Sequence, residues 1–177
     1  MYMKAKGLCI FVLAAIVVAN AARAATWEDR WTYEREGVEV FPANQLSLDA
    51  FGTYADRDRT GDAVHHLGGG LGLDYFFNRY IGISGDTYIE EWKWPYRVNG
   101  DAIIRLPLQG RWGGFSPYVL GGGGRQFKDI PQYSWNAGGG FEFKFNPYTG
   151  IFADARRVFP DKTGDYYLVR TGLRIGF

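Results

Sequence analysis

The two histidines, His65 and His66, are the residues of this 177-residue sequence best suited to proton transfer or metal binding. They are the only histidines of the chain, and they precede the glycine-rich run LGGGLGLDY. We predict that this segment is a β-strand, in which neighbouring side chains point to opposite faces. Two imidazoles on opposite faces are poorly placed to share one ion, so we interpret them as polar residues at the rim of a sheet.

A serine nucleophile needs a general base within hydrogen-bond reach and a third group that orients this base. No serine lies near the two histidines in the sequence, and four serines of the predicted strands have no evident base: Ser47, Ser84, Ser116 and Ser134. We therefore expect no catalytic site and predict that the protein is not an enzyme.

Two glycine-rich runs could suggest a phosphate-binding loop. GGGLGL at 68–73 does not fit the GxGxxG pattern, and GGGGRQFK at 121–128 lacks the Gly-Lys-Ser/Thr spacing of a P-loop. We expect no nucleotide, no metal ion and no other cofactor.

Composition indicates which kind of fold must position these residues. Aromatic residues make up 18% of the chain, and it contains 25 glycines. Aromatic residues are frequent in strands, and few strong helix formers accompany them, so we predict an all-β protein. The formal net charge of +1 offers no electrostatic reason to expect nucleic acid as a partner.

Residues 1–24 have the pattern of a secretory signal peptide. Lys4 and Lys6 precede an uncharged apolar stretch at 7–19, and Ala22-Arg23-Ala24 places small residues at the two positions that determine cleavage. We predict cleavage after Ala24, with a retained membrane anchor as the alternative. Cleavage would also remove Cys9, the only cysteine, so the exported protein would contain no disulfide.

Residues 25–44 differ from the rest of the chain. Trp27 and Trp31 lie four positions apart among charged residues, which fits a short amphipathic helix or a disordered segment, and Pro42 ends the segment. We predict a periplasmic lead-in that is partly ordered against the following domain.

Residues 45–177 alternate between apolar and polar residues, as strands with two different faces do. We predict eight strands, at 46–54, about 64–77, 80–92, 99–108, 116–127, 135–145, 149–158 and 166–177. The alternation leaves open which face residues 116–127 turn inward.

The predicted connections alternate in length. Short turns are expected at 78–79 and 146–148, with a modest link at 109–115, and longer polar loops at 55–63, 91–100, 125–133 and 157–165. This alternation is typical of an antiparallel up-and-down transmembrane β-barrel with short periplasmic turns and long outer loops. With eight strands, both termini would lie in the periplasm.

The stretch WNAGGGFEFKF at 135–145 has one apolar and one polar face, as do most of the other strands. The polar faces together carry seven acids and five bases: Asp49, Asp74, Asp86, Glu90, Asp101, Glu142, Asp154, Arg105, Lys144, Arg156, Arg170 and Arg174. Near-balanced charges and glycines on one face suit a narrow lumen, where charges must pair and glycines make room. We predict that this face points inward, and that Arg170 and Arg174 pair with Asp49, Glu142 or Asp154.

Aromatic residues gather at both ends of the predicted strands, as they do at the two interfaces of a bilayer. One group lies near the short turns: Tyr75, Phe77, Tyr80, Trp112, Phe115, Phe145 and Tyr148. The other lies near the long loops: Tyr54, Trp92, Trp94, Tyr133, Trp135, Tyr166 and Tyr167.

The leader, the PYVLGGGG of residues 117–124 and the C-terminal YLVRTGLRIGF together resemble the eight-stranded outer-membrane β-barrel family, the small OmpA/OmpX-like barrels. The resemblance covers residues 45–177. It implies that the barrel-assembly machinery recognises the apolar face of the last strand, which carries Tyr167, Leu173, Ile175 and Phe177.

These patterns predict a monomeric integral outer-membrane protein with a polar, largely plugged lumen and a structural or surface-interaction role. Outer-membrane lipids and lipopolysaccharide are the expected partners, with EWKWPYR at 91–97 as the first candidate contact patch. That loop could equally be an interfacial anchor. The alternatives are a lipid A-modifying enzyme, a small pore, and a soluble periplasmic ligand-binding barrel.

Overall fold

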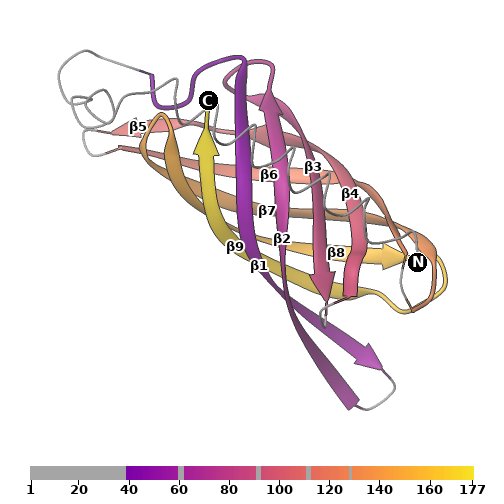
Figure 1. The fold of residues 1–177 in the computed structure, drawn as a ribbon. Coiled ribbons are helices and arrows are strands. Elements are labelled where there is room, and N and C mark those ends of the chain that lie inside the picture. The colour runs from indigo at the N-terminus through magenta and orange to yellow at the C-terminus, as the bar shows by residue number, and fades with distance from the viewer. Residues whose placement is uncertain (1–38, 60–61, 91–92, 111–112, 128) are drawn as a thin grey trace, which may run out of the picture. The chain divides into compact units, whose positions relative to one another are not determined.

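The fold is seen in a computed structural model, which describes residues 39–59, 62–90, 93–110, 113–127 and 129–177 (Figure 1). The side chains of residues 57–65, 90–95 and 109–112 are not described. The predicted signal peptide and most of the predicted lead-in therefore lie outside the described residues. In the part of the chain that is described, no helix has the length and apolar character needed to cross a membrane.

In the described residues, nine antiparallel strands form one sheet. They are β1 (Gln45–Arg59), β2 (Asp62–Phe76), β3 (Ile81–Glu90), β4 (Lys93–Arg105), β5 (Leu108–Gly110), β6 (Gly113–Gln126), β7 (Gln132–Asn146), β8 (Thr149–Pro160) and β9 (Tyr166–Gly176). β1 pairs with both β2 and β9, and β4 pairs with both β3 and β6, so the sheet closes on itself. The three-residue β5 pairs only with β6, and the wall is an eight-stranded barrel, as predicted.

Two of the predicted long loops are wrong. β1 and β2 continue to pair as far as Arg59↔Asp62, within the predicted loop at 55–63, and β4 begins at Lys93, within the predicted loop at 91–100. Polar sequence suggested loops there, but strand pairing needs only backbone N–H and C=O partners, which a neighbouring strand supplies. The β1–β2 hairpin consequently projects beyond the other strands (Figure 1).

The undecided strand, β6, turns Ser116, Tyr118 and Leu120 inward. Its register with β4 requires this choice, because Leu120 lies opposite Ile103 and Tyr118 lies opposite Arg105. Residues opposite each other in a pair of strands point to the same face of the sheet.

The burial pattern is inverted relative to that of a water-soluble protein. Val119 and Phe141 are 59% and 47% exposed on the outside, whereas Glu142 and Arg156 are 0% and 1% exposed inside. The predicted assignment of the two faces is confirmed, and it produces an apolar outer surface that only a hydrocarbon environment would cover.

The inward glycines make room in the lumen, as predicted. A Cβ added at Gly140 would lie 2.6 Å from the Cβ of Asp154, and one added at Gly70 would lie 2.7 Å from the Phe51 ring. Both distances are shorter than real contacts allow, so the neighbouring strands approach each other only because these positions lack a side chain.

The described aromatic residues form exposed groups at both ends of the barrel. Phe77, Tyr80, Phe115 and Phe145 are exposed at one end, and Tyr54, Tyr133, Trp135 and Tyr167 are exposed at the other. Tyr166 was wrongly placed in the second group. It is buried, because it shares the inward phase of Leu168 and Arg170 on β9. The side chains of Trp92, Trp94 and Trp112 lie outside the described residues.

Candidate functional site

The barrel has two distinct ends. β1 begins where β9 ends, with Ser47 opposite Gly176, and this end is called the terminal end. The other end carries the loops at 127–131 and 161–165 and the projecting β1–β2 hairpin, and it is called the distal end.

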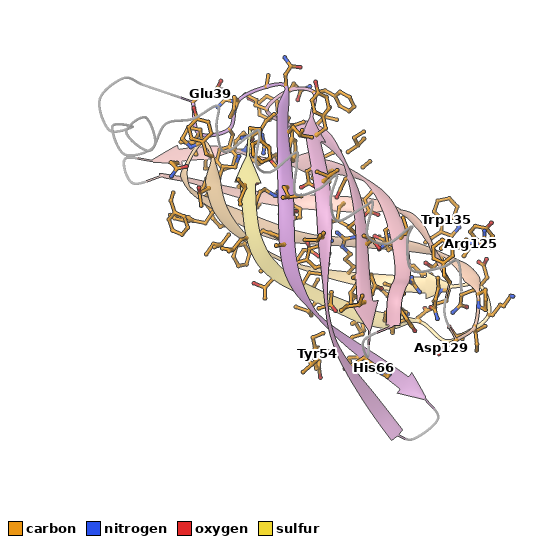
Figure 2. The ribbon with its side chains drawn as sticks, viewed as in Figure 1. Glu39, Tyr54, His66, Arg125, Asp129 and Trp135 are labelled. Carbon is orange, nitrogen blue, oxygen red and sulfur yellow. The ribbon has the colours of Figure 1, made fainter. Side chains whose placement is uncertain are left out.

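The predicted chemistry-bearing residues do not gather into one site. His65 and His66 both lie in β2, opposite Asp56 and Ala55 in the register, and Figure 2 shows His66 near the base of the projecting hairpin. Within the described ranges there is no group of three or more acidic, histidine or cysteine side chains placed to hold a metal ion. The four serines considered as nucleophiles are all buried on the lumen face of their strands: Ser47, Ser84, Ser116 and Ser134.

The central layer of the lumen is a network of buried ion pairs. Arg170 on β9 donates to Asp86 on β3 over 2.7 Å and to Asp154 on β8 over 2.8 Å. Arg156 on β8 donates to Asp101 on β4 over 2.5 Å, to Asp154 over 3.1 Å and to Asp86 over 3.3 Å. The network therefore links β8 and β9 to β3 and β4 across the lumen.

Arg156 and Asp86 lie on opposite walls. In the closed ring, β8 and β3 are separated by three strands in either direction. An eight-stranded barrel is narrow enough for one arginine side chain to cross it. Amide groups satisfy two of the remaining carboxylate oxygens, since Asn99 donates to Asp86 over 2.7 Å and Asn136 donates to Asp101 over 2.8 Å.

A second layer lies nearer the terminal end and is centred on Arg174. Its guanidinium donates to Asp49 over 2.7 Å and to Glu142 over 3.1 Å, and it also pairs with Asp74. Arg105 and Lys144 each lie 3.6 Å from a Glu142 oxygen. Acids and bases from five strands therefore meet in this layer.

The predicted pairings of Arg170 with Asp154, and of Arg174 with Asp49 and Glu142, are confirmed. Among the described residues, the buried charges balance at six acids and six bases: Asp49, Asp74, Asp86, Asp101, Glu142, Asp154, Arg97, Arg105, Lys144, Arg156, Arg170 and Arg174. Glu90 was also predicted to point inward, but its side chain is not described.

Arg97 is the buried base that sequence reasoning missed. It was assigned to a loop, but it donates to Ser134 over 2.6 Å and to Gln126 over 2.9 Å inside the distal part of the lumen. The missed signal was its phase, since Arg97 alternates in step with Asn99 and Asp101. Residues 93–97 of the EWKWPYR segment therefore belong to β4 and not to the predicted surface loop, and Tyr96 and Arg97 are both buried.

The distal part of the lumen also contains an apolar cluster. It consists of Ala55, Tyr88, Tyr96, Val158, Tyr166 and Leu168, and it continues through Phe51 and Phe152, which the strand registers place between the central layer and the layer of Arg174; all eight are buried. Arg97 stacks on the Tyr166 ring, with 5.6 Å between its Cζ and the ring centroid. Large side chains thus occupy the lumen on the distal side of the central ion pairs.

At the terminal end, the segment before β1 packs into the barrel mouth. Val40 and Phe41 are buried, and a Cβ added at Gly114 would overlap the Phe41 ring. Arg105 Cζ lies 5.0 Å and Lys144 Nζ lies 5.2 Å from the Phe41 ring centroid. An aromatic ring therefore covers the terminal side of the second charged layer.

No protein-family model matches this sequence, and no curated protein sequence matches it. The similarities are to solved structures. The N-terminal β-barrel domain of Pseudomonas aeruginosa OprF has a TM-score of 0.59 at 18% identity, covering 76% of this chain and 98% of that one. Neisserial surface protein A has a TM-score of 0.54 at 12% identity, and the match covers 80% of this chain and 100% of that one.

A third similar structure is Ail, the attachment invasion locus protein of Yersinia pestis, in complex with the heparin analogue sucrose octasulfate. Its TM-score is 0.50 at 14% identity, and the match covers 76% of this chain and 99% of that one. At these identities the likeness concerns the fold. Together with the inverted burial pattern and the closed ring of strands, it shows that this chain has the fold of the small eight-stranded outer-membrane β-barrels.

Proposed function

We propose that the protein is a non-conducting, non-enzymatic outer-membrane barrel that interacts with other molecules at the cell surface. Its terminal end faces the periplasm, and its distal end faces outward. The projecting β1–β2 hairpin and the loops at 127–131 and 161–165 supply the contacts.

One observation carries the proposal of a plugged lumen, namely the ion-pair network that joins β8 and β9 to β3 and β4. An ion crossing the lumen would have to separate buried charges that are already paired, and removing a partner from such a pair is costly. Most of the apolar cluster lies on the distal side of the network, and Phe41 lies on its terminal side. Both narrow the path for an ion further.

Conductance of the purified protein in a planar lipid bilayer tests this proposal. We expect no channel steps from the wild-type protein. The double variant Arg156→Ser/Arg170→Ser removes the two side chains that cross the central layer, and it should conduct if it still folds. Regular steps from the wild-type protein would contradict a plugged lumen and support the alternative of a small pore.

A surface role is supported by the length of the hairpin and by the fold. The solved structure of Ail holds a sulfated saccharide analogue, so a barrel of this architecture can bind an anionic sugar. The competing lipid A-modifying activity is tested by mass spectrometry of lipid A from cells with and without the protein. A mass change in lipid A that depends on the protein would overturn the non-enzymatic assignment.

Location and folding are tested by cell fractionation and gel migration. A folded outer-membrane barrel should be found in the outer-membrane fraction and should migrate differently before and after heating. Recovery in the soluble periplasmic extract would instead support a soluble barrel.

We also propose that the barrel-assembly machinery recognises β9. Leu173, Ile175 and Phe177 are exposed on its outer face, and Phe177 N donates to the backbone oxygen of Leu46 on β1 over 2.8 Å. Leu173→Asn/Ile175→Asn should lower the amount of barrel assembled in cells. A control with Leu106→Asn, also exposed but before β5, should assemble normally.

A further inference from the structure

Two arginines stand out on the outer face of the barrel near the distal end. Arg125 lies near the end of β6, and Arg157 lies in the distal half of β8. Both point outward, whereas the arginines of the ion-pair layers point into the lumen.

The strand registers place these arginines among exposed aromatic residues. Arg125 lies opposite Tyr133 on β7, Trp135 lies opposite Phe159 on β8, and Arg157 lies opposite Tyr167 on β9. Trp135 and Tyr133 are 70% and 61% exposed. Figure 2 shows Arg125 and Trp135 at the same end of the barrel. These residues, together with Phe127, form one continuous surface over four strands, which is called the distal outer patch.

The rings of the distal outer patch hold both guanidinium groups in place. Arg125 Cζ is 5.4 Å from the Phe127 ring centroid and 5.3 Å from that of Tyr133. Arg157 Cζ is 5.3 Å from the Phe159 centroid and 6.0 Å from that of Tyr167. Stacking on aromatic rings orients a guanidinium and leaves its N–H donors at the edge available to a ligand.

The two arginines differ in their remaining partners. Arg157 Nη2 donates to Asp165 over 3.1 Å, in a pair that is about half exposed. Among the described residues, no carboxylate lies within ion-pair distance of Arg125. Arg125 is therefore the better placed of the two to receive an anion, with Arg157 as a second, partly neutralised contact.

The outer surface between the distal outer patch and the terminal end is apolar. On the same outer face, Val119 and Val169 are exposed nearer the middle of the barrel, and Phe141, Ile151 and Leu173 are exposed further toward the terminal end. A ligand that matches this face has an anionic group at the level of the arginines and hydrocarbon chains that extend along the wall. A planar guanidinium binds the oxygens of a phosphate through two parallel hydrogen bonds.

We propose that the distal outer patch binds a phosphorylated, multiply acylated glycolipid of the outer leaflet, the lipid A part of lipopolysaccharide. Arg125 binds a phosphate, Arg157 supports it, and Trp135 packs against the sugar or the first carbons of an acyl chain. This inference names the partner of the surface role proposed above and rests on the distal end facing outward.

Binding to purified lipids tests the proposal directly. The protein is purified folded in a nonionic detergent and titrated with bisphosphorylated lipid A, with the same lipid after removal of its phosphates, and with phosphatidylglycerol. We expect bisphosphorylated lipid A to bind at least about tenfold more tightly than either of the other lipids, because only it combines the phosphates with the full set of acyl chains. Equal affinity for lipid A with and without phosphates, or for phosphatidylglycerol, would overturn the proposal.

Variants identify the residues responsible. Arg125→Gln should remove most of the discrimination between the two forms of lipid A, Arg157→Gln should remove less of it, and Arg125→Lys should restore part of it. Trp135→Ala should weaken the binding of both forms of lipid A equally.

The matched control is Lys162→Gln, which removes one exposed positive charge at the same end but outside the patch. It should leave the discrimination unchanged. Discrimination that survives Arg125→Gln, or that Lys162→Gln abolishes equally, would overturn the site.

Heat-modifiable migration of every variant shows that the barrel is folded before binding is compared. The detergent assay depends neither on orientation nor on conductance. Failure of the lipid site therefore leaves a folded barrel without phosphate preference, whereas failure of the proposed function shows as channel steps or as recovery outside the outer membrane.

Discussion

Arg170 and Asp86 are 84 residues apart in the chain and lie on strands separated by β1 and β2, yet Arg170 Nη1 is 2.7 Å from Asp86 Oδ2. Arg170 also donates to both oxygens of Asp154 on the neighbouring strand, from Nε to Oδ1 over 3.1 Å and from Nη2 to Oδ2 over 2.8 Å. One guanidinium thus connects walls of the barrel that no backbone hydrogen bond joins.

Reversal of this charge should destabilise the barrel strongly. In Arg170→Glu, a third carboxylate would lie beside Asp86 and Asp154, and Arg156 would face these three carboxylates and Asp101 without the help of Arg170. Breaking a buried ion pair costs about 3–5 kcal/mol. The thermal midpoint of the refolded barrel is the measurement. Asp165→Asn, which breaks the exposed pair with Arg157, is the control and should cost less than about 1 kcal/mol. An unchanged midpoint for Arg170→Glu would show that the central network does not stabilise the barrel.

A methyl group at an inward glycine should be poorly tolerated. In Gly140→Ala the new Cβ would meet the Asp154 Cβ at 2.6 Å, so β7 and β8 would have to move apart, at a cost of about 1–3 kcal/mol. The matched control is Gly121→Ala on the outer face, where the nearest atom would be the Asn136 carbonyl oxygen at 3.6 Å. Urea unfolding in lipid vesicles compares the two variants, and equal stabilities would contradict close packing in the lumen.

A charge on the outer face should cost more at mid-strand than near a strand end. Val119→Lys places an ammonium group near the middle of β6, where contact with hydrocarbon costs about 2–4 kcal/mol. Leu106→Lys lies just after the end of β4, and its cost should be about 0–1 kcal/mol. Unfolding titrations in vesicles measure both. If Val119→Lys is tolerated as well as Leu106→Lys, the outer face does not contact lipid at that depth.

Phe41 should stabilise the terminal mouth. Phe41→Ala removes the ring that packs on Arg105 and Lys144, and we expect a loss of up to about 3 kcal/mol, at the low end for a buried phenylalanine because the mouth borders solvent. Phe41→Leu keeps most of the side-chain volume and should retain more than half of the free energy of unfolding that Phe41→Ala loses. Phe41→Ala should still give no channel steps, because the ion pairs on the distal side of the terminal mouth remain in place. An unchanged free energy of unfolding for Phe41→Ala would mean that the ring contributes nothing to the closed end.

The sequence by itself determined the class of fold and the two faces of the wall. The alternation in WNAGGGFEFKF and in YLVRTGLRIGF shows which residues share a face, since successive residues of a strand point in opposite directions. The glycines on one face, together with the near balance of acids and bases there, indicated which face was the lumen. The same rule would have placed Arg97 inside, had its polar neighbours not been interpreted as a loop.

Only the tertiary structure decided which strands meet across the lumen and which residues become neighbours on the outside. Arg174 pairs with Asp49, which lies 125 residues earlier, and Arg125 lies beside Tyr133 because of the register of β6 and β7. Alternation repeats every two residues along a strand, so it excludes a one-residue shift between neighbouring strands but does not distinguish shifts of two or four residues, and it contains no information about closure of the ring. Pairing across a barrel depends on both, and these emerge only when all eight strands of the wall are hydrogen-bonded together.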